Sequence, residues 1–193
     1  MDQKKLSRII AQAKAGDTAA YESLMAAYQA RLFGYFLRAT GRQHDAEDLF
    51  GELVLRLVRN IKDYDEQGRF EAWLFRMAAN LNRDRIRKLK ARPATLSLSN
   101  GRDEEKSIGR NLPAAQPDVD AGLLSEELSL ELHEALARLD DVTRDMILLR
   151  HFGEMSFKEI SKEFHCPLGT ALARIHRGLK MLRKFMNIPE GTR

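Results

Sequence analysis

Apolar residues recur along the chain at helical spacing. They fall three and four positions apart, which places them on one face of a helix. No segment alternates apolar and polar residues for long, so the pattern predicts an all-α fold without a sheet. The predicted helices span about residues 6–15, 19–40, 45–61, 70–89, 123–139, 142–152, 156–165 and 167–186.

Residues with strong end preferences mark several of these helices. Asp17 or Thr18 can cap the second helix, and Gly41 can end it as a C-cap glycine. Ser156 and Glu159 have the spacing of a capping box, which predicts a helix start at this point.

The third helix is predicted to open at Asp45 with an acidic first turn. Asp45, Glu47 and Asp48 lie where the helix dipole favours carboxylates. The expected buried side consists of Leu49, Leu53, Leu57 and Ile61, broadened by Phe50, Val54 and Val58.

Residues 93–122 interrupt the helical pattern. They contain three prolines, three glycines, clustered charges and few apolar residues, a composition typical of a flexible linker. We therefore expect two small helical domains, residues 1–92 and 123–193.

Charge is unevenly distributed over the 193 residues, whose net charge is +4. Residues 1–92 carry +6 and residues 165–193 carry +5, whereas residues 93–122 and 123–164 carry −2 and −5. Two basic regions with an acidic one between them suit a protein that touches a polyanion at two places.

The last two predicted helices have the pattern of a helix-turn-helix. Pro167 suits the first turn of the second helix, which would lie in the DNA major groove. Its expected core stripe is Leu168, Leu172, Ile175, Leu179, Leu182 and Met186. Its opposite face carries Thr170, Ala173, Arg174, Arg177, Lys180 and Lys184. The alternative is an ordinary amphipathic helix with a solvated basic face.

The fourth helix carries a second basic stripe, beside an apolar side formed by Phe70, Trp73, Leu74, Met77 and Leu81. Arginine neutralises phosphates and asparagine can read a base edge. The aromatic side chains could stack on unpaired bases, or Phe70 and Trp73 could simply be core residues. Asn80 could equally be a buried polar residue or a cap. The stripe consists of Arg76, Asn80, Arg83 and Arg87, with Tyr64, Phe70 and Trp73 as the aromatic cluster beside it.

Other chemistry has little support. The single Cys166 and the lack of an 18-residue apolar run lead us to expect a cytoplasmic protein that does not insert into a membrane. We expect no cofactor and no metal, because neither His44 with its acidic neighbours nor His165 and Cys166 with His176 has a supporting ligand set. Phosphate-cradling glycine loops and catalytic triads have no match in the sequence, which argues against an enzyme.

The order of these motifs resembles the extracytoplasmic-function (group 4) sigma factors of bacterial RNA polymerase. In the first domain the resemblance rests on GD at 16–17, DAEDL at 45–49, Phe70, Trp73-Leu74, Asn80, Asp84 and Arg87. In the second it rests on LDD at 139–141, LLRHFGEMSFKEIS at 148–161, GT at 169–170, Arg174, His176-Arg177 and Leu182-Arg183.

The resemblance implies that residues 1–92 bind core polymerase and the −10 promoter element. An acidic surface would bind the clamp helices of the largest subunit, and loop 62–69 would receive a flipped base that Asn80 discriminates. The core-binding residues would be Asp45, Glu47, Asp48 and Glu52. The −10 residues would be Tyr64, Phe70, Trp73, Arg76, Asn80, Arg83 and Arg87.

The resemblance also implies that the linker threads the polymerase and that residues 123–193 bind the polymerase flap and the −35 element. A protein inhibitor, an anti-sigma factor, is a further expected partner. The −35 residues would be Thr170, Ala173, Arg174, His176, Arg177, Lys180 and Lys184.

Three positions depart from the family pattern. Gly51 stands where relatives often carry Gln, and glycine costs a helix about 1 kcal/mol relative to alanine. Leu172 and Ala173 stand where many relatives carry a basic residue and Ser, so the −35 sequence cannot be transferred.

Two other functions remain open on the sequence. A stand-alone helix-turn-helix regulator with a sensing first domain would bind duplex DNA tightly by itself. An all-helical enzyme would need a catalytic constellation. The acidic helix start and the basic stripe together favour the sigma factor, because a sensor domain requires neither.

Overall fold

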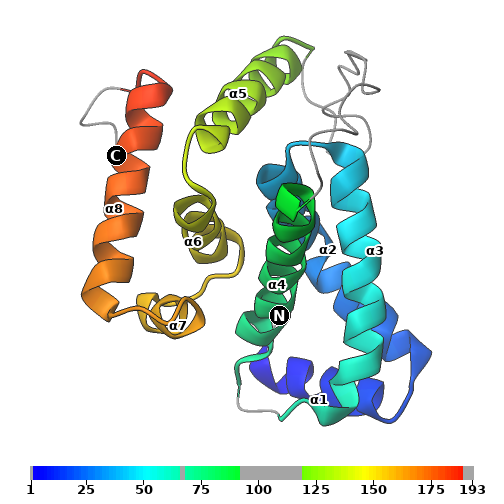
Figure 1. Cartoon of the computed structure of the whole chain (residues 1–193). Helices are drawn as coiled ribbons and strands as arrows, with labels where there is room; N and C mark the ends of the chain where they lie inside the picture. The colour runs from blue at the N-terminus through cyan, green and yellow to red at the C-terminus, as the bar shows by residue number, and fades with distance from the viewer. Residues whose placement is uncertain (1, 66–67, 92–118, 189–193) are drawn as a thin grey trace.

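The computed structural model describes residues 2–65, 68–91 and 119–188, and for residues 119–127 it describes the backbone only. This part of the chain is helical and contains no strand, so the all-α prediction is confirmed (Figure 1). The elements are α1 (Gln3–Lys14), α2 (Thr18–Thr40), α3 (Gln43–Asn60), the 3-10 turn η1 (Ile61–Asp63), α4 (Phe70–Ala91), α5 (Val119–Ala137), α6 (Asp141–Phe152), α7 (Phe157–Glu163) and α8 (Leu168–Phe185).

Helices α1 to α4 form a first lobe around α2. The Asp17 carboxylate caps α2 by accepting from the Ala19 N–H, and Gly41 ends it in the left-handed conformation, as predicted. Helices α3 and α4 pack on α2 with fully buried aromatic and leucine side chains between them. Members of this core include Tyr35, Phe36, Leu53, Leu57 and Phe75.

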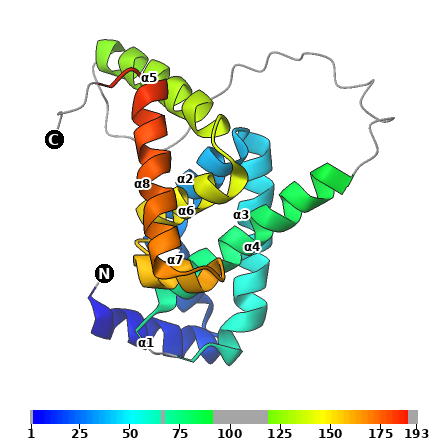
Figure 2. The ribbon, with the colours of Figure 1, turned by 60° about the vertical axis from the view of Figure 1, so that its left-hand side comes forward.

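Helices α5 to α8 form a second lobe. Ser156 and Glu159 make the predicted capping box, so α7 begins where the sequence indicates. The N-terminal end of α8 follows α7 directly, and α8 then packs across α6 (Figure 2).

The two lobes pack against each other through α2 and α6. A Cβ on Gly34 would lie 2.8 Å from the Phe152 ring, and one on Gly153 would lie 3.1 Å from Phe75. The glycines thus let each lobe receive an aromatic ring of the other. The two hydrophobic cores are consequently continuous.

Some helix boundaries differ from the sequence prediction. Helix α3 begins at Gln43, so Asp45 lies inside the first turn and does not open the helix. Helix α5 begins at Val119, four residues before the predicted start. The predicted linker, 93–122, otherwise lies outside the described residues.

The predicted core stripe of α8 is partly wrong. Leu168 and Leu179 are 47% and 43% exposed, whereas Ala171 and Gly178 are buried with Ile175 and Leu182. A Cβ on Gly178 would lie 2.5 Å from Thr143 on α6, so the helices approach at this glycine. Small residues therefore face α6, and two of the leucines are displaced toward solvent.

Candidate nucleic-acid interface

A pocket of about 350 Å³ lies between the end of α3 and the middle of α4. Asn80 is exposed at this pocket, which excludes the alternative that it is a buried polar residue. An open amide beside aromatic rings is suited to holding an unstacked base, because it offers both a donor and an acceptor. The lining residues are Arg56, Asn60, Asp63, Tyr64, Trp73, Met77 and Asn80.

The aromatic cluster is divided between core and pocket. Phe70 is 1% exposed, so the core alternative is correct for this residue and it has no face for stacking on a base. Its ring centroid lies 5.4 Å from that of Tyr64 and 5.6 Å from that of Trp73. Trp73 is half-buried and lines the pocket. Tyr64 also lines it but is only 6% exposed. Phe70 therefore supports the two rings that face the pocket.

Three lining residues were not assigned to the site from the sequence: Arg56, Asn60 and Met77. Asp63 belongs to loop 62–69, which was expected to receive the base. Arg56 and Asn60 lie on α3, and helical spacing gives no information on which residues of α3 contact α4. Only the crossing of α3 and α4 brings them to Asn80. No local signal in the sequence could have identified Arg56 and Asn60, whereas Met77 lies one turn before Asn80 on the same helix.

The basic stripe of α4 is largely ion-paired. The Arg76 guanidinium lies 2.8 Å from the Glu163 carboxylate, and Arg83 lies 2.6 Å from Glu163 and 3.3 Å from Asp145. Burial acts to lower the pKa of Arg83, but the hydrogen bond to Glu163 and the charge of Asp145 raise it overall. Arg87, by contrast, is 78% exposed and lies 3.3 Å from Asp84 of its own helix.

The acidic residues of α3 lie on an exposed face of the first lobe. Glu47 accepts from Gln43, and Asp48 lies 3.7 Å from His44 one turn away. Glu52 accepts from Arg56 at 3.0 Å. Such surface pairs contribute little to the stability of the fold, so the carboxylates remain available to a partner.

Asp45 differs from the other three carboxylates of this group. It is half-buried and ion-paired with Arg85 of α4. We therefore expect its main contribution to be the join between α3 and α4.

Two apolar side chains extend the exposed face of α3. Leu55 is 58% exposed and Val58 is 44% exposed, although the periodicity had placed Val58 on the buried side. They continue the acidic row along the helix, since Leu55 lies three residues after Glu52. A face with carboxylates at one end and apolar side chains at the other is suited to a basic, partly apolar protein partner.

The basic face of α8 is exposed. The Arg177 guanidinium donates to the Ala173 carbonyl at 3.3 Å, a contact that holds the side chain along the helix. The His176 ring stacks on Phe157 of α7 at 6.3 Å, which ties the two helices of the motif together. The exposed members of the predicted −35 set are Thr170, Ala173, His176, Arg177, Lys180 and Lys184.

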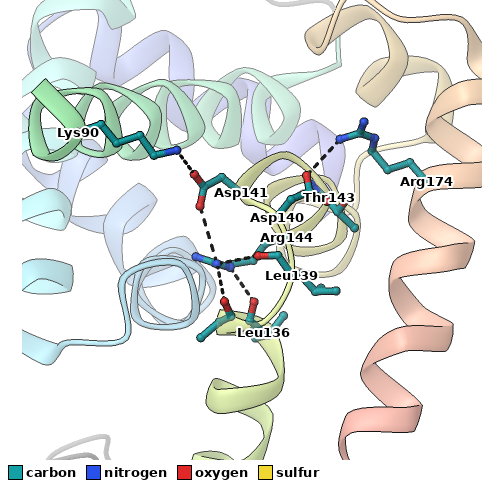
Figure 3. A network of polar contacts seen from close by, with 9 residues as sticks. Lys90, Leu136, Leu139, Asp140, Asp141, Thr143, Arg144 and Arg174 are labelled. Atoms are coloured by element: carbon teal, nitrogen blue, oxygen red, sulfur yellow. Dashed lines mark hydrogen bonds and ion pairs between the residues drawn. The ribbon is translucent and has the colours of Figure 1, made fainter.

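Arg174 is the exception on this face, because its guanidinium lies 3.1 Å from the Asp140 carboxylate (Figure 3). Asp140 also caps α6 by accepting from the Thr143 N–H and hydroxyl. Burial acts to raise the pKa of Asp140, but these hydrogen bonds and Arg174 lower it overall. Arg174 is thereby positioned by the start of α6.

Two negative observations bear on other functions. The described residues contain no group of His, Cys, Asp and Glu side chains arranged to hold a metal ion. None of the described helices has the length and apolar character needed to span a bilayer.

Two solved structures have the same fold as this chain. The structure of CnrH in complex with the cytosolic domain of CnrY covers 93% of this chain and 95% of its own, at 22% identity and a TM-score of 0.63. The sigma factor RpoE in complex with the anti-sigma factor NepR from Bartonella quintana covers 88% and 98%, at 17% identity and a TM-score of 0.65.

Sequence comparison identifies the family. Residues 24–92 match Sigma-70 region 2, and residues 129–182 match Sigma-70, region 4. The ECF RNA polymerase sigma factor SigW of Bacillus subtilis is 32% identical over 179 residues, which are 93% of this chain and 95% of the relative. SigE of Mycolicibacterium smegmatis is also 32% identical, over 89% of this chain and 64% of the relative. The chain therefore belongs to the extracytoplasmic-function sigma factors of the sigma-70 family.

Proposed function

We propose that this chain is a dissociable, non-catalytic specificity subunit that directs core RNA polymerase to promoters with its own −10 and −35 elements. The observation that carries the proposal is the pocket at Asn80 and Trp73, two residues of the helix that also carries Arg76, Arg83 and Arg87. A double-stranded operator offers no unstacked base to such a pocket, whereas a melting promoter does.

We assign −10 recognition to the first lobe. Asn80, Trp73 and Tyr64 would hold the flipped base, with Asn60 as an additional amide near it. Arg76, Arg83 and Arg87 would neutralise phosphates of the same strand. Residues 1–92 remain our boundary for this domain.

We assign −35 recognition to the second lobe, over residues 123–193. Helix α8 would enter the major groove by its N-terminal half. Ala173, Arg177 and His176 would lie nearest the base edges, while Lys180 and Lys184 would reach phosphates. Asp140 would hold Arg174 at a constant angle to the groove.

We assign core binding to the exposed face of α3. The carboxylates of Glu47, Asp48 and Glu52 would meet a basic partner surface, the clamp helices of the largest subunit. Leu55 and Val58 would provide the apolar centre of this contact, since rim charges alone contribute little affinity. The −35 lobe would meet the polymerase flap.

We further infer a protein inhibitor of the anti-sigma type. RpoE of Bartonella quintana, whose fold resembles this one, was solved in complex with an anti-sigma factor. A partner of this kind would act in the cytoplasm, where the polymerase is found.

The decisive test is reconstitution with core polymerase. The purified chain should co-elute with core and direct new transcription starts on a pool of genomic fragments. The Asp48→Arg variant should lose co-elution, whereas Glu131→Arg, which changes an exposed carboxylate on α5, should keep it. Tight duplex binding without core, and no new starts with it, would support a stand-alone regulator instead.

A further inference from the structure

Three cations of α4 point toward the second lobe in a single row. Arg76, Arg83 and Lys90 are spaced by seven residues, which places them within about 40° of one another around the helix. Each meets a carboxylate of the second lobe. Arg76 and Arg83 share Glu163, and Lys90 lies 2.7 Å from Asp141 (Figure 3).

Two of the carboxylates that these cations meet, Glu163 and Asp145, are buried, and α2 contacts one of them. The Glu163 side chain is 7% exposed and Asp145 is 3% exposed. The Tyr35 hydroxyl of α2 donates to Asp145. The Arg83 guanidinium also lies over the Phe164 ring, 5.0 Å from its centroid. The second lobe therefore contacts α4 with buried carboxylates and an aromatic ring.

We propose that the second lobe of this chain acts as an internal substitute for promoter phosphate and holds the free protein in a closed form. This latch consists of Arg76, Arg83 and Lys90 on α4 with Asp141, Asp145 and Glu163 on the second lobe. The inference rests on the proposed −10 role of Arg76 and Arg83.

The latch competes with DNA for the same positive charges. A guanidinium that pairs with a buried carboxylate cannot also neutralise a phosphate, so −10 binding requires the lobes to separate. Asn80 and Arg87 stay exposed in the closed form. The closed chain keeps its base pocket, but Arg76 and Arg83 are not available to bind phosphates of the strand.

Replacement of Glu163 offers a direct test, because this carboxylate pairs with both arginines. Glu163 is the last residue of α7, where the helix dipole tolerates a cation, so Glu163→Arg should fold. Glu163→Gln removes the charge with the least change of shape. Glu131→Arg and Glu131→Gln make the same charge changes on an exposed residue of α5.

Two readouts on the full-length chain are needed. X-ray scattering measures the radius of gyration, which is about 16 Å for a compact chain of this length. Fluorescence anisotropy with a labelled 20-nucleotide single strand of mixed sequence measures DNA affinity against salt. We expect Glu163→Arg to expand the chain by about 3 Å or more. We also expect DNA affinity to rise about tenfold, with a salt slope steeper by about 1.

The controls separate release of the latch from a simple gain of positive charge. Glu163→Gln should raise the affinity about threefold, whereas both Glu131 variants should leave the radius unchanged and alter affinity less than their Glu163 counterparts. The double variant Arg76→Glu, Glu163→Arg should return the chain to the compact radius. Glu163 variants that match the Glu131 variants in both readouts would overturn the latch. Expansion without a gain in DNA affinity would overturn the masking, and the transcription assay with core tests the proposed function independently.

Discussion

Single residues at the pocket divide into those that face it and those that support it. Asn80 and Trp73 face the space, while Phe70 lies behind the aromatic rings in the core. The same division applies to the acidic row of α3, where Glu52 is open and Asp45 is engaged by Arg85. Exposure therefore separates recognition residues from structural ones with the same chemistry.

Asn80→Ala should reduce promoter opening more than promoter binding. The amide would contact the base only after it leaves the stack, so its loss should lower open-complex formation about tenfold, or about 1.4 kcal/mol. Permanganate reactivity of the melted strand measures opening, and filter binding at low temperature measures the closed complex. Equal losses in both assays would contradict a base-reading role, and Asn80→Gln should restore part of the activity.

Leu55→Ala should weaken core binding about fivefold without destabilising the protein. The side chain is 58% exposed, so truncation removes little buried surface from the free chain but an apolar anchor from the complex. Biosensor titration with core measures the affinity, and thermal unfolding checks the fold. Leu128→Ala, at a residue 56% exposed on α5, is the matched control. Equal affinities for the two variants would remove Leu55 from the core-binding face.

The packing of helices in this protein depends on small residues as well as on apolar stripes. Helix α8 approaches α6 at Gly178, where a larger side chain would hold the axes apart. Helix α3 carries Gly51 on its open face, where a Cβ would meet nothing within 4 Å. The same residue type thus has opposite consequences in the two helices.

Gly51→Ala and Gly178→Ala should change stability in opposite directions. Alanine at 51 should stabilise the protein by about 1 kcal/mol through helix propensity alone. Alanine at 178 would approach Thr143 to 2.5 Å and Ile147 to 2.8 Å, and relief of these contacts should cost about 1–2 kcal/mol. Urea unfolding of the two variants measures both effects. Stabilisation by Gly178→Ala would show that α8 is packed less tightly on α6 than described.

At the largest scale the described residues form two lobes (Figure 2). The lobes share one continuous hydrophobic core. Ion pairs border the contact on the α4 side, and Arg38 of α2 donates to the Ser129 carbonyl and hydroxyl on the α5 side. Arg31 of α2 donates to the Phe152 carbonyl between them. Apolar contacts at Gly34 and Gly153 lie between these polar ones, so both kinds of contact hold the lobes together.

Tyr35→Phe should weaken the docking of the lobes by about 1–3 kcal/mol, because it leaves buried Asp145 with one partner fewer. Urea unfolding measures the loss, and hydrogen exchange in α6 locates it. Tyr21→Phe, on a half-exposed residue of the same helix, is the control.

Acidification provides a second check on this prediction. Burial raises the pKa of Asp145, and the Tyr35 hydrogen bond and Arg83 oppose the rise. Removal of the hydroxyl should raise this pKa further, and protonation at low pH relieves the buried charge. The destabilisation should therefore be smaller at about pH 4.5 than at about pH 7. A loss that does not depend on pH would show that Asp145 is not the group affected.

Local pattern was sufficient to predict the helices and several of their ends, although the starts of α3 and α5 differ from the prediction. The capping box at Ser156, the Asp17 cap and the Gly41 C-cap depend on neighbours a few residues away, and all three are present. Family membership followed from motif order across both domains. By contrast, the exposed Val58 and Leu179 show that periodicity identifies an apolar side without showing how much of it a neighbour covers.

The acidic segment, residues 123–164, shows the limit of the sequence most clearly. Its net charge of −5 is apparent from the sequence. From the sequence alone, the basic regions on either side of it were expected to bind a polyanion. The amino-acid sequence determined the charges, the helices and the motif order, because each depends on side-chain type and short-range spacing. Which cations meet Asp145 and Glu163, and which α3 residues reach the pocket of Asn80, depended on the crossing of distant helices. Those contacts arise from the packing of helices, about which spacing along the chain carries no information.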